Sequence, residues 1–334
     1  MTNLVTLLKL YLLSILCSVV FIQTSVVAQE METRYIVDEE GYPPMSAIRG
    51  YATIGGDSAV YVDNTHNIFL LISDRREKII GQVGNGSCEH RSVTSFTVGG
   101  DTLFVLDSRS GRIVEYSIDR GDCVAEVGTE LSRFGQIGRH GDAFYLIKRG
   151  SYTSASPSDE PLFYRLNSAG QLQPLNLTIG DLDRTQLFPI PVRLGRRIPQ
   201  VKEKEGKLYF ILPFSHKIWI YDPQTEDFSS FDLVNNPPDI SERNFPTDTQ
   251  GVSQLLSESE LEMGFFPLEN VIATLSLFEL QPIVRIYSYD GNLIGEETDV
   301  KHVDFEERGR LYSLQATDSE TEIYSIEPID LRLN

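Results

Sequence analysis

Apolar residues in this chain recur as pairs of short runs. Each pair opens after a tight polar turn, continues through a nearly all-apolar run, and ends in a second run that tends to alternate apolar and polar residues. A run that is apolar throughout predicts a strand covered on both faces, whereas alternation predicts a strand with one exposed face. The first runs are Ser58–Val62, Thr102–Leu106, Ala143–Ile147, Leu208–Leu212, Val271–Leu275 and Leu311–Leu314, and the second runs are Ile68–Ile72, Ile113–Tyr116, Leu162–Leu166, Ile218–Tyr221, Ile283–Tyr287 and Ile323–Ile326.

The paired runs repeat at the spacing of β-propeller blades. The period is roughly 40 to 50 residues, which is typical of units built from four short strands. Turn residues after most second runs lead into weaker fourth strands, at Cys123–Val127, Gln171–Leu177, Phe228–Leu233 and Leu293–Glu296. The sequence therefore predicts an all-β fold, a six-bladed β-propeller with four-stranded antiparallel blades.

The two ends of the repeat region are expected to complete one blade together. Arg34–Val37 reads as a strand but precedes the first blade without a partner of its own, and few residues follow Ile326. Pairing of the N-terminal strand into the last blade would close the ring and remove an exposed sheet edge.

The first 28 residues have the layout of a secretory signal peptide. Lys9 precedes an uncharged apolar stretch from Leu10 to Ile22, and Val26 and Ala28 occupy the positions that signal peptidase reads. An uncleaved membrane anchor is the alternative, but this stretch is shorter than the ~20 residues that span a bilayer. We expect residues 1–28 to be removed on export through the Sec route, leaving residues 29–334 as one propeller domain in the periplasm, on the outer surface or outside the cell, with no integral membrane span.

The net charge of −19 disfavours nucleic acid as a partner. Loss of Lys9 with the signal peptide would move this charge to −20. Such a surface repels phosphate backbones, and otherwise it argues for solubility. We expect the mature chain to be a monomer.

Cys88 and Cys123 remain after cleavage, and their predicted positions argue against a disulfide. An exported pair would ordinarily form one. The blade pattern, however, places Cys88 in a loop between blades and Cys123 at the start of an outer strand on the opposite rim. A disulfide requires Cα atoms within ~7 Å of each other.

Several segments resemble a known family. Ile80–Glu89, Leu103–Asp107 and Arg112–Tyr116 look like the repeat of secreted bacterial six-bladed β-propellers related to the NHL and TolB-like groups. The resemblance covers residues 51–128 best and fades through blades four and five. It implies the fold and export far more than any activity.

Long connections are expected to gather on one face of this propeller. We call the four strands of a blade a to d, from the inner strand outward. The chain enters and leaves each blade so that the b-to-c and d-to-a connections share a face. The long connections of this kind are Arg149–Glu160, Thr178–Pro191 and Asn235–Ser259. Extra loop length on one rim is typical of a binding surface, although a tolerated insertion is the alternative for the Ser-rich part of the first connection.

Cations just after the second of these connections are the first candidates for ligand binding. Arg193, Arg196 and Arg197 precede Lys202 and Lys204 in a strongly acidic chain. If this segment is the inner strand of blade four, some guanidinium groups point to the channel and could hold a carboxylate or sulfate in bidentate fashion. The alternative is that these cations offset nearby acids of the chain itself.

The turns after the first runs supply the other candidates, His66, Arg109 and His216. His66 and Arg109 lie next to Asp63 and Asp107, which close the first runs of blades one and two. We expect the two aspartates to cap their turns by accepting backbone N–H bonds rather than to contact a ligand.

The sequence lacks the familiar catalytic and metal-binding motifs. Asp181 and Asp183 alternate as in a calcium loop, but Gln186 stands where that loop needs glycine. We therefore expect no cofactor and no metal site.

The leading hypothesis is an exported, non-catalytic propeller that binds a small anionic ligand, a glycan or a cell-envelope protein through its long-loop face. The alternative is a metal-dependent hydrolase resembling the gluconolactonase and regucalcin propellers, with Ca²⁺ held by acids from several inner strands. The expected first inner strand, Ser46–Ile54, contains no acid, although Glu39 and Glu40 lie just before it. A structural role in an envelope complex is the third possibility.

Overall fold

The structure is a computed structural model of residues 1–334. It describes residues 34–37, 48–55, 58–63, 65–72, 75–128, 130–149, 157–182, 201–212, 217–233, 251, 254, 261–267, 271–278, 281–298, 305–307, 310–318 and 323–328. The signal peptide expected over residues 1–28 therefore lies outside the described residues. Within the described part of the chain, no helix has both the length and the apolar character needed to cross a membrane.

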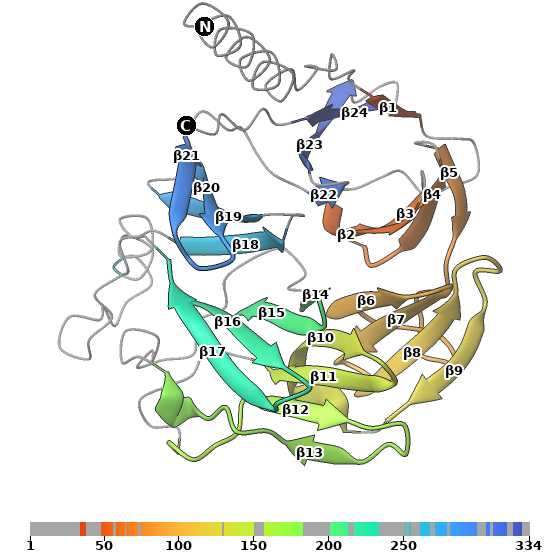
Figure 1. The fold of residues 1–334 in the computed structure, drawn as a ribbon. Coiled ribbons are helices and arrows are strands. Elements are labelled where there is room, and N and C mark those ends of the chain that lie inside the picture. Colours follow the sequence, from red (N-terminus) through yellow and green to blue (C-terminus); the bar gives the residue numbers. More distant parts are fainter. Residues whose placement is uncertain are drawn as a thin grey trace, which may run out of the picture. The chain divides into compact units, whose positions relative to one another are not determined.

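The described strands form a propeller of small four-stranded antiparallel sheets (Figure 1). Five of these sheets each take four consecutive strands, and a further sheet joins β22, β23 and β24 to β1. The consecutive sheets are β2 (Ile48–Gly55), β3 (Ser58–Asp63), β4 (Ile68–Ile72) and β5 (Arg75–Ile79); β6 (Ser95–Gly99), β7 (Thr102–Asp107), β8 (Arg112–Ser117) and β9 (Cys123–Val127); β10 (Phe134–His140), β11 (Ala143–Lys148), β12 (Phe163–Leu166) and β13 (Leu172–Pro174); β14 (Lys202–Lys204), β15 (Lys207–Ile211), β16 (Lys217–Asp222) and β17 (Asp227–Asp232); and β18 (Leu261–Pro267), β19 (Val271–Phe278), β20 (Gln281–Ser288) and β21 (Leu293–Glu297).

The remaining sheet contains the N-terminal strand. It consists of β22 (Phe305–Glu307), β23 (Arg310–Asp318), β24 (Ile323–Pro328) and β1 (Arg34–Val37). Strand β1 pairs antiparallel with β24, so that Arg34 lies opposite Ile326 and Val37 opposite Ile323. The N-terminal strand thus has the partner that the sequence predicted for it.

Successive sheets contact each other through their first strands. Strand β22 contacts β2, β2 contacts β6, β6 contacts β10, β10 contacts β14, and β14 contacts β18. Because each contact joins one sheet to the next in the chain, the sheets follow one another in sequence order, as in a propeller.

The hydrophobic core lies between neighbouring sheets. The first predicted run of each of blades one to four is a nearly fully buried second strand, and its side chains pack against the next sheet. Phe104 of β7 meets Phe144 of β11 at 5.1 Å between ring centroids, and Phe163 of β12 stacks on Phe210 of β15 at 4.9 Å. Aromatic pairs of this kind add to the burial of apolar area that holds the sheets together.

The inner strand of the fourth sheet is β14, which lies at the C-terminal end of the segment proposed from sequence. It spans Lys202–Lys204 and is joined to β15 by Glu205 and Gly206, both at positive φ (51° and 79°). Two residues in this conformation make the tight hairpin that matches strand twist. The segment that the sequence proposed as this inner strand therefore contains β14 at its C-terminal end, while Arg193–Arg197 lies outside the described residues.

Cys88 and Cys123 form a disulfide, contrary to the prediction from the blade pattern. Their Cα atoms lie 5.5 Å apart. The loop after β5 does not stay on its own rim: Gly81 N–H donates to Gly121 O in the β8–β9 turn, and the Tyr116 hydroxyl donates to Cys88 O. Strand twist tilts the outer strands away from the inner ones, so the loop reaches the start of β9. The prediction had placed Cys88 and Cys123 on opposite rims of the propeller.

Candidate functional site

Two of the predicted site residues, His66 and Arg109, lie among the described residues. Arg193, Arg196, Arg197 and His216 lie outside them. His66 is held by the loop between β5 and β6, since its carbonyl accepts from His90 Nε2 (2.9 Å) and its Nδ1 accepts from Val93 N–H (3.3 Å). Arg109 is exposed in the β7–β8 turn. The two residues therefore lie in the b-to-c turns of neighbouring blades.

Asp63 and Asp107 cap their turns as predicted. Both are fully buried. Asp63 Oδ1 accepts the backbone N–H groups of Thr65 (2.8 Å) and Asn67 (3.0 Å). Asp107 accepts from the N–H groups of Arg109 (3.0 Å) and Ser110 (3.2 Å), and also from Arg91 (2.7 Å) in the β5–β6 loop. Asp107 thus joins a b-to-c turn to a d-to-a loop.

The long connections of blade three meet on one face, as the predicted chain path requires. Pro161, before β12, forms an isolated β-bridge with Thr178, which follows β13. Ser158 O accepts from Gly180 N–H (2.7 Å), and Glu160 O accepts from Ile179 N–H (3.0 Å). These bonds place the short helix η2 (Ile179–Asp181) on the b-to-c connection and make one surface from the two connections.

Asp181 stabilises the start of η2 on this same surface. Its carboxylate accepts from Thr178 N–H (2.7 Å) and from the Thr178 hydroxyl (2.8 Å), which is the bonding of a helix start. Asp183 and Gln186 lie outside the described residues. Over the described ranges, no three His, Cys, Asp or Glu side chains gather as a metal site would require.

Next to this surface lies a group of cations that we call the cationic rim. It consists of Arg91, Arg109, Arg133 and Arg149, which come from the b-to-c connections of blades two and three and the d-to-a loops before them, and of Lys148, the last residue of β11. Arg149 Nη1 donates to the Ser108 hydroxyl (2.8 Å), and Arg149 N–H donates to Arg133 O (2.8 Å). The rim therefore extends from one blade to the next.

Positive charges in the rim lie close enough to affect each other. The pKa of Lys148 is lowered, first by burial and then by the charge of Arg133. Lys148 pairs with Glu160. Arg133 instead lies over two aromatic rings, with its guanidinium carbon 5.0 Å from the centre of Tyr164 and 5.2 Å from that of Phe134, a favourable arrangement for an arginine.

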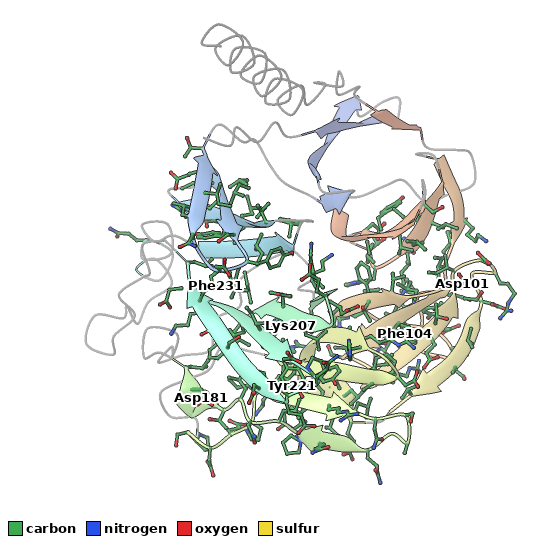
Figure 2. The ribbon with its side chains drawn as sticks, in the orientation of Figure 1. Asp101, Phe104, Asp181, Lys207, Tyr221 and Phe231 are labelled. Atoms are coloured by element: carbon green, nitrogen blue, oxygen red, sulfur yellow. A yellow bond between two sulfur atoms is a disulfide. The ribbon has the colours of Figure 1, made fainter. Side chains whose placement is uncertain are left out.

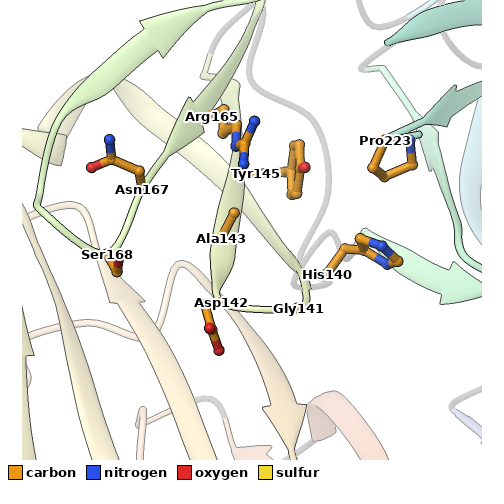
Figure 3. A pocket seen from close by; sticks show the side chains of 9 residues that line it. All are labelled: His140, Gly141, Asp142, Ala143, Tyr145, Arg165, Asn167, Ser168 and Pro223. Carbon is orange, nitrogen blue, oxygen red and sulfur yellow. The ribbon is translucent and has the colours of Figure 1, made fainter. Parts of the chain in front are cut away.

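A groove lies on the opposite face, among the short turns of blades three and four (Figure 3). Its volume is about 350 Å³. It is lined by His140, Gly141, Asp142, Ala143, Tyr145, Arg165, Asn167, Ser168 and Pro223. Arg165 lies beside Tyr145 in this view, and its Nη1 is 3.9 Å from the Glu226 carboxylate. The sequence analysis missed this groove, because the short turns that form it carry no signal of binding.

The buried histidine that contacts His66 predicts a pH dependence of stability. His90 is 1 % exposed, and its Nδ1 lies 2.8 Å from the Tyr116 hydroxyl. Burial lowers the pKa of His90, although its bond to His66 and the charge of Asp107 oppose this shift. Below about pH 6.5 the unfolded chain binds a proton at this histidine more readily than the folded chain does. The free energy of unfolding therefore decreases as the pH is lowered.

We expect His90→Gln to lose part of this pH dependence. Denaturant unfolding at pH 8, 6 and 5 should show a shallower decline for the variant than for the wild type between pH 6.5 and 5. Glutamine retains an amide donor and an acceptor, so the comparison isolates the titrating group. Parallel curves for the two proteins would contradict the assignment of this dependence to His90.

The fold and the described face define this protein as an all-β propeller. The chain resembles a member of the DUF4221 family from Bacteroides vulgatus, with a TM-score of 0.60 and 11% identity over 91% of this chain and 97% of that one. It is equally similar to a candidate exported protein of Bacteroides fragilis, with a TM-score of 0.60 and 13% identity over 93% and 98% of the two chains. A protein of unknown function from Bacteroides thetaiotaomicron follows, with a TM-score of 0.50 and 10% identity over 90% and 77%. No family model and no curated protein matches the sequence.

Proposed function

We propose that this chain is an exported, non-catalytic β-propeller that acts without a cofactor and binds a small ligand or an envelope partner through its long-loop face. The observation that carries the proposal is the surface formed where the two long connections of blade three bridge each other, at Pro161 and Thr178. This surface adjoins the cationic rim, which offers charge to an anionic group of the ligand.

The proposal includes a closed, six-bladed ring made by the pairing of β1 into the last blade. A ring holds the connections of successive blades side by side, which is how propellers build a continuous face from separate loops. Export is supported by the layout of residues 1–28, and a protein of similar fold from Bacteroides fragilis is itself a candidate exported protein.

We expect blocking of the long-loop face to abolish binding. Asp159 and Ser168 are both exposed, the first on the long-loop face and the second on the short-turn face. Each is replaced by cysteine in the mature, disulfide-bonded protein and coupled to a polyethylene glycol maleimide. The probes are biotinylated acidic and neutral trisaccharides and a detergent extract of envelope proteins, and retention of each probe is measured.

The proposal requires that the coupled Asp159→Cys protein lose retention while the coupled Ser168→Cys protein keeps it. The reverse result would move the site to the groove on the short-turn face and would overturn the proposal. Uncoupled variants serve as controls, because they carry the substitution without the blocking polymer.

A further inference from the structure

We propose that the cationic rim is a binding site for a compact ligand that carries two or more carboxylate or sulfate groups, such as a short acidic oligosaccharide. The inference rests on the proposed function, since it names the ligand chemistry of the long-loop face. It is independent of Arg193, Arg196 and Arg197, which lie outside the described residues.

The first argument is that the backbone holds the rim together. Arg91 and Arg109 belong to different connections, yet their N–H groups donate to the two oxygens of the same buried carboxylate, Asp107. Neither side chain is needed for these bonds. Both guanidinium groups are therefore free to face a ligand while their main chains stay fixed.

The second argument is that the rim is continuous across the boundary between blades two and three. Ser108, which follows Asp107, accepts from Arg149 of the next blade, and its hydroxyl also lies 2.7 Å from that of Thr94. Arg149 in turn follows Lys148 and bonds to the main chain of Arg133. The site thus brings guanidinium donors from two neighbouring blades onto one rim, where they can hold separate anionic groups of one ligand.

The third argument is that the arginines of the rim are not neutralised by the described part of the protein. Nine ion pairs join described side chains, and they include Arg112, Arg120, Arg139, Arg165 and Arg285. Within the described ranges no carboxylate pairs with Arg91, Arg109, Arg133 or Arg149. In a chain of net charge −19, arginines left unpaired beside one another form a local positive site that favours an anion.

The same charge limits the size of the ligand. Outside the rim the chain is strongly acidic, so a long polyanion would meet repulsion as it extended beyond the rim. A compact ligand keeps its negative groups over the arginines. Arginine binds carboxylate and sulfate in bidentate fashion, which lets two or three such groups be held at once.

Isothermal titration of the mature protein with trigalacturonate, sulfated galactotriose and neutral galactotriose tests this inference. We expect both acidic probes to bind, with affinity that falls as salt rises, and the neutral probe not to bind. The two acidic arms distinguish carboxylate from sulfate. Arg91→Gln combined with Arg109→Gln should weaken binding at least tenfold, because each removed donor forms a charge-assisted bond to the ligand.

Arg120→Gln is the matched control. Arg120 is exposed on the short-turn side and pairs with Asp122, so its loss should change the affinity less than twofold. Equal binding of the neutral probe, no binding of either acidic probe, or unchanged affinity in the Arg91 and Arg109 variant would overturn the inference. If that variant binds normally while polymer at Asp159→Cys still abolishes binding, the inference fails and the proposed function stands. If only polymer at Ser168→Cys abolishes binding, the proposed function fails as well.

Discussion

Replacement of Asp107 by alanine is expected to lower the free energy of unfolding by about 4 kcal/mol. The carboxylate is fully buried and accepts three backbone N–H groups, from Arg91, Arg109 and Ser110. Alanine would leave these three part-buried donors without their acceptor, and an unsatisfied buried group costs roughly 1–3 kcal/mol. Denaturant unfolding of the variant at pH 7 measures the loss.

Two comparison variants separate this role from a general effect of removing an acid. Asp107→Asn retains one oxygen acceptor and should fall between wild type and Asp107→Ala. Asp222→Ala removes a half-buried acid that caps a single N–H, of Gln224 at 2.9 Å, and should cost only about 1 kcal/mol. Equal losses for Asp107→Ala and Asp222→Ala would show that the bridge between the two connections adds nothing.

Asp107 also links stability to the proposed site. It fixes the main chains of Arg91 and Arg109 at the same time, so its loss should loosen the two connections that carry them, although Thr94 and Ser108 still join these connections. From the sequence we predicted that Asp107 caps its turn and that Arg109 is a candidate ligand-binding residue. The sequence could not predict Arg91, because Asp107, the partner of Arg91 N–H, is distant in the chain. The bond is also made by the backbone N–H, so it does not depend on which residue stands at this position.

The strands were the most predictable part of the structure, since their signal is local. All-apolar runs such as Thr102–Leu106 became buried second strands, and the expected partner of Arg34–Val37 followed from the number of strands left over. The bounds of strand β14 could not be predicted within the segment that was proposed for it, because the strand is short and made of charged residues, Lys202–Lys204. The signal that could have located it is the Glu205-Gly206 turn directly before an apolar run.

Features that depend on how the sheets twist and pack could not be predicted. Figure 2 shows the side chains that the sheets carry, and contacts between blades, such as that of Arg149 with Ser108, depend on how the sheets are placed. The groove on the short-turn face arises in the same way, from turns of two blades that carry no common motif. The disulfide was wrongly predicted to be absent for this reason.

Loss of the disulfide is the second large effect that we expect. Cys88→Ser combined with Cys123→Ser should lower the free energy of unfolding by about 3–4 kcal/mol, since the bond closes a loop with a sequence separation of 35 in the unfolded chain. For a domain of this size the unfolding midpoint should fall by roughly 5 °C or more. Calorimetry of the variant and of the wild type, with and without reductant, measures the change.

The location of the disulfide predicts that its loss changes the stability of the protein more than the affinity for the ligand. Cys88 lies in the loop that leads to Arg91, and this loop is also held by Arg112, whose Nη2 donates to Glu89 O (2.6 Å) and Gly86 O (2.7 Å). Because these bonds and the Asp107 cap remain in the double variant, the loop should stay in place in the folded state and the affinity for trigalacturonate should change little. A reductant should lower the midpoint of the wild type and leave that of the variant unchanged. If the reductant changed both midpoints equally, the stabilisation could not come from a bond between Cys88 and Cys123.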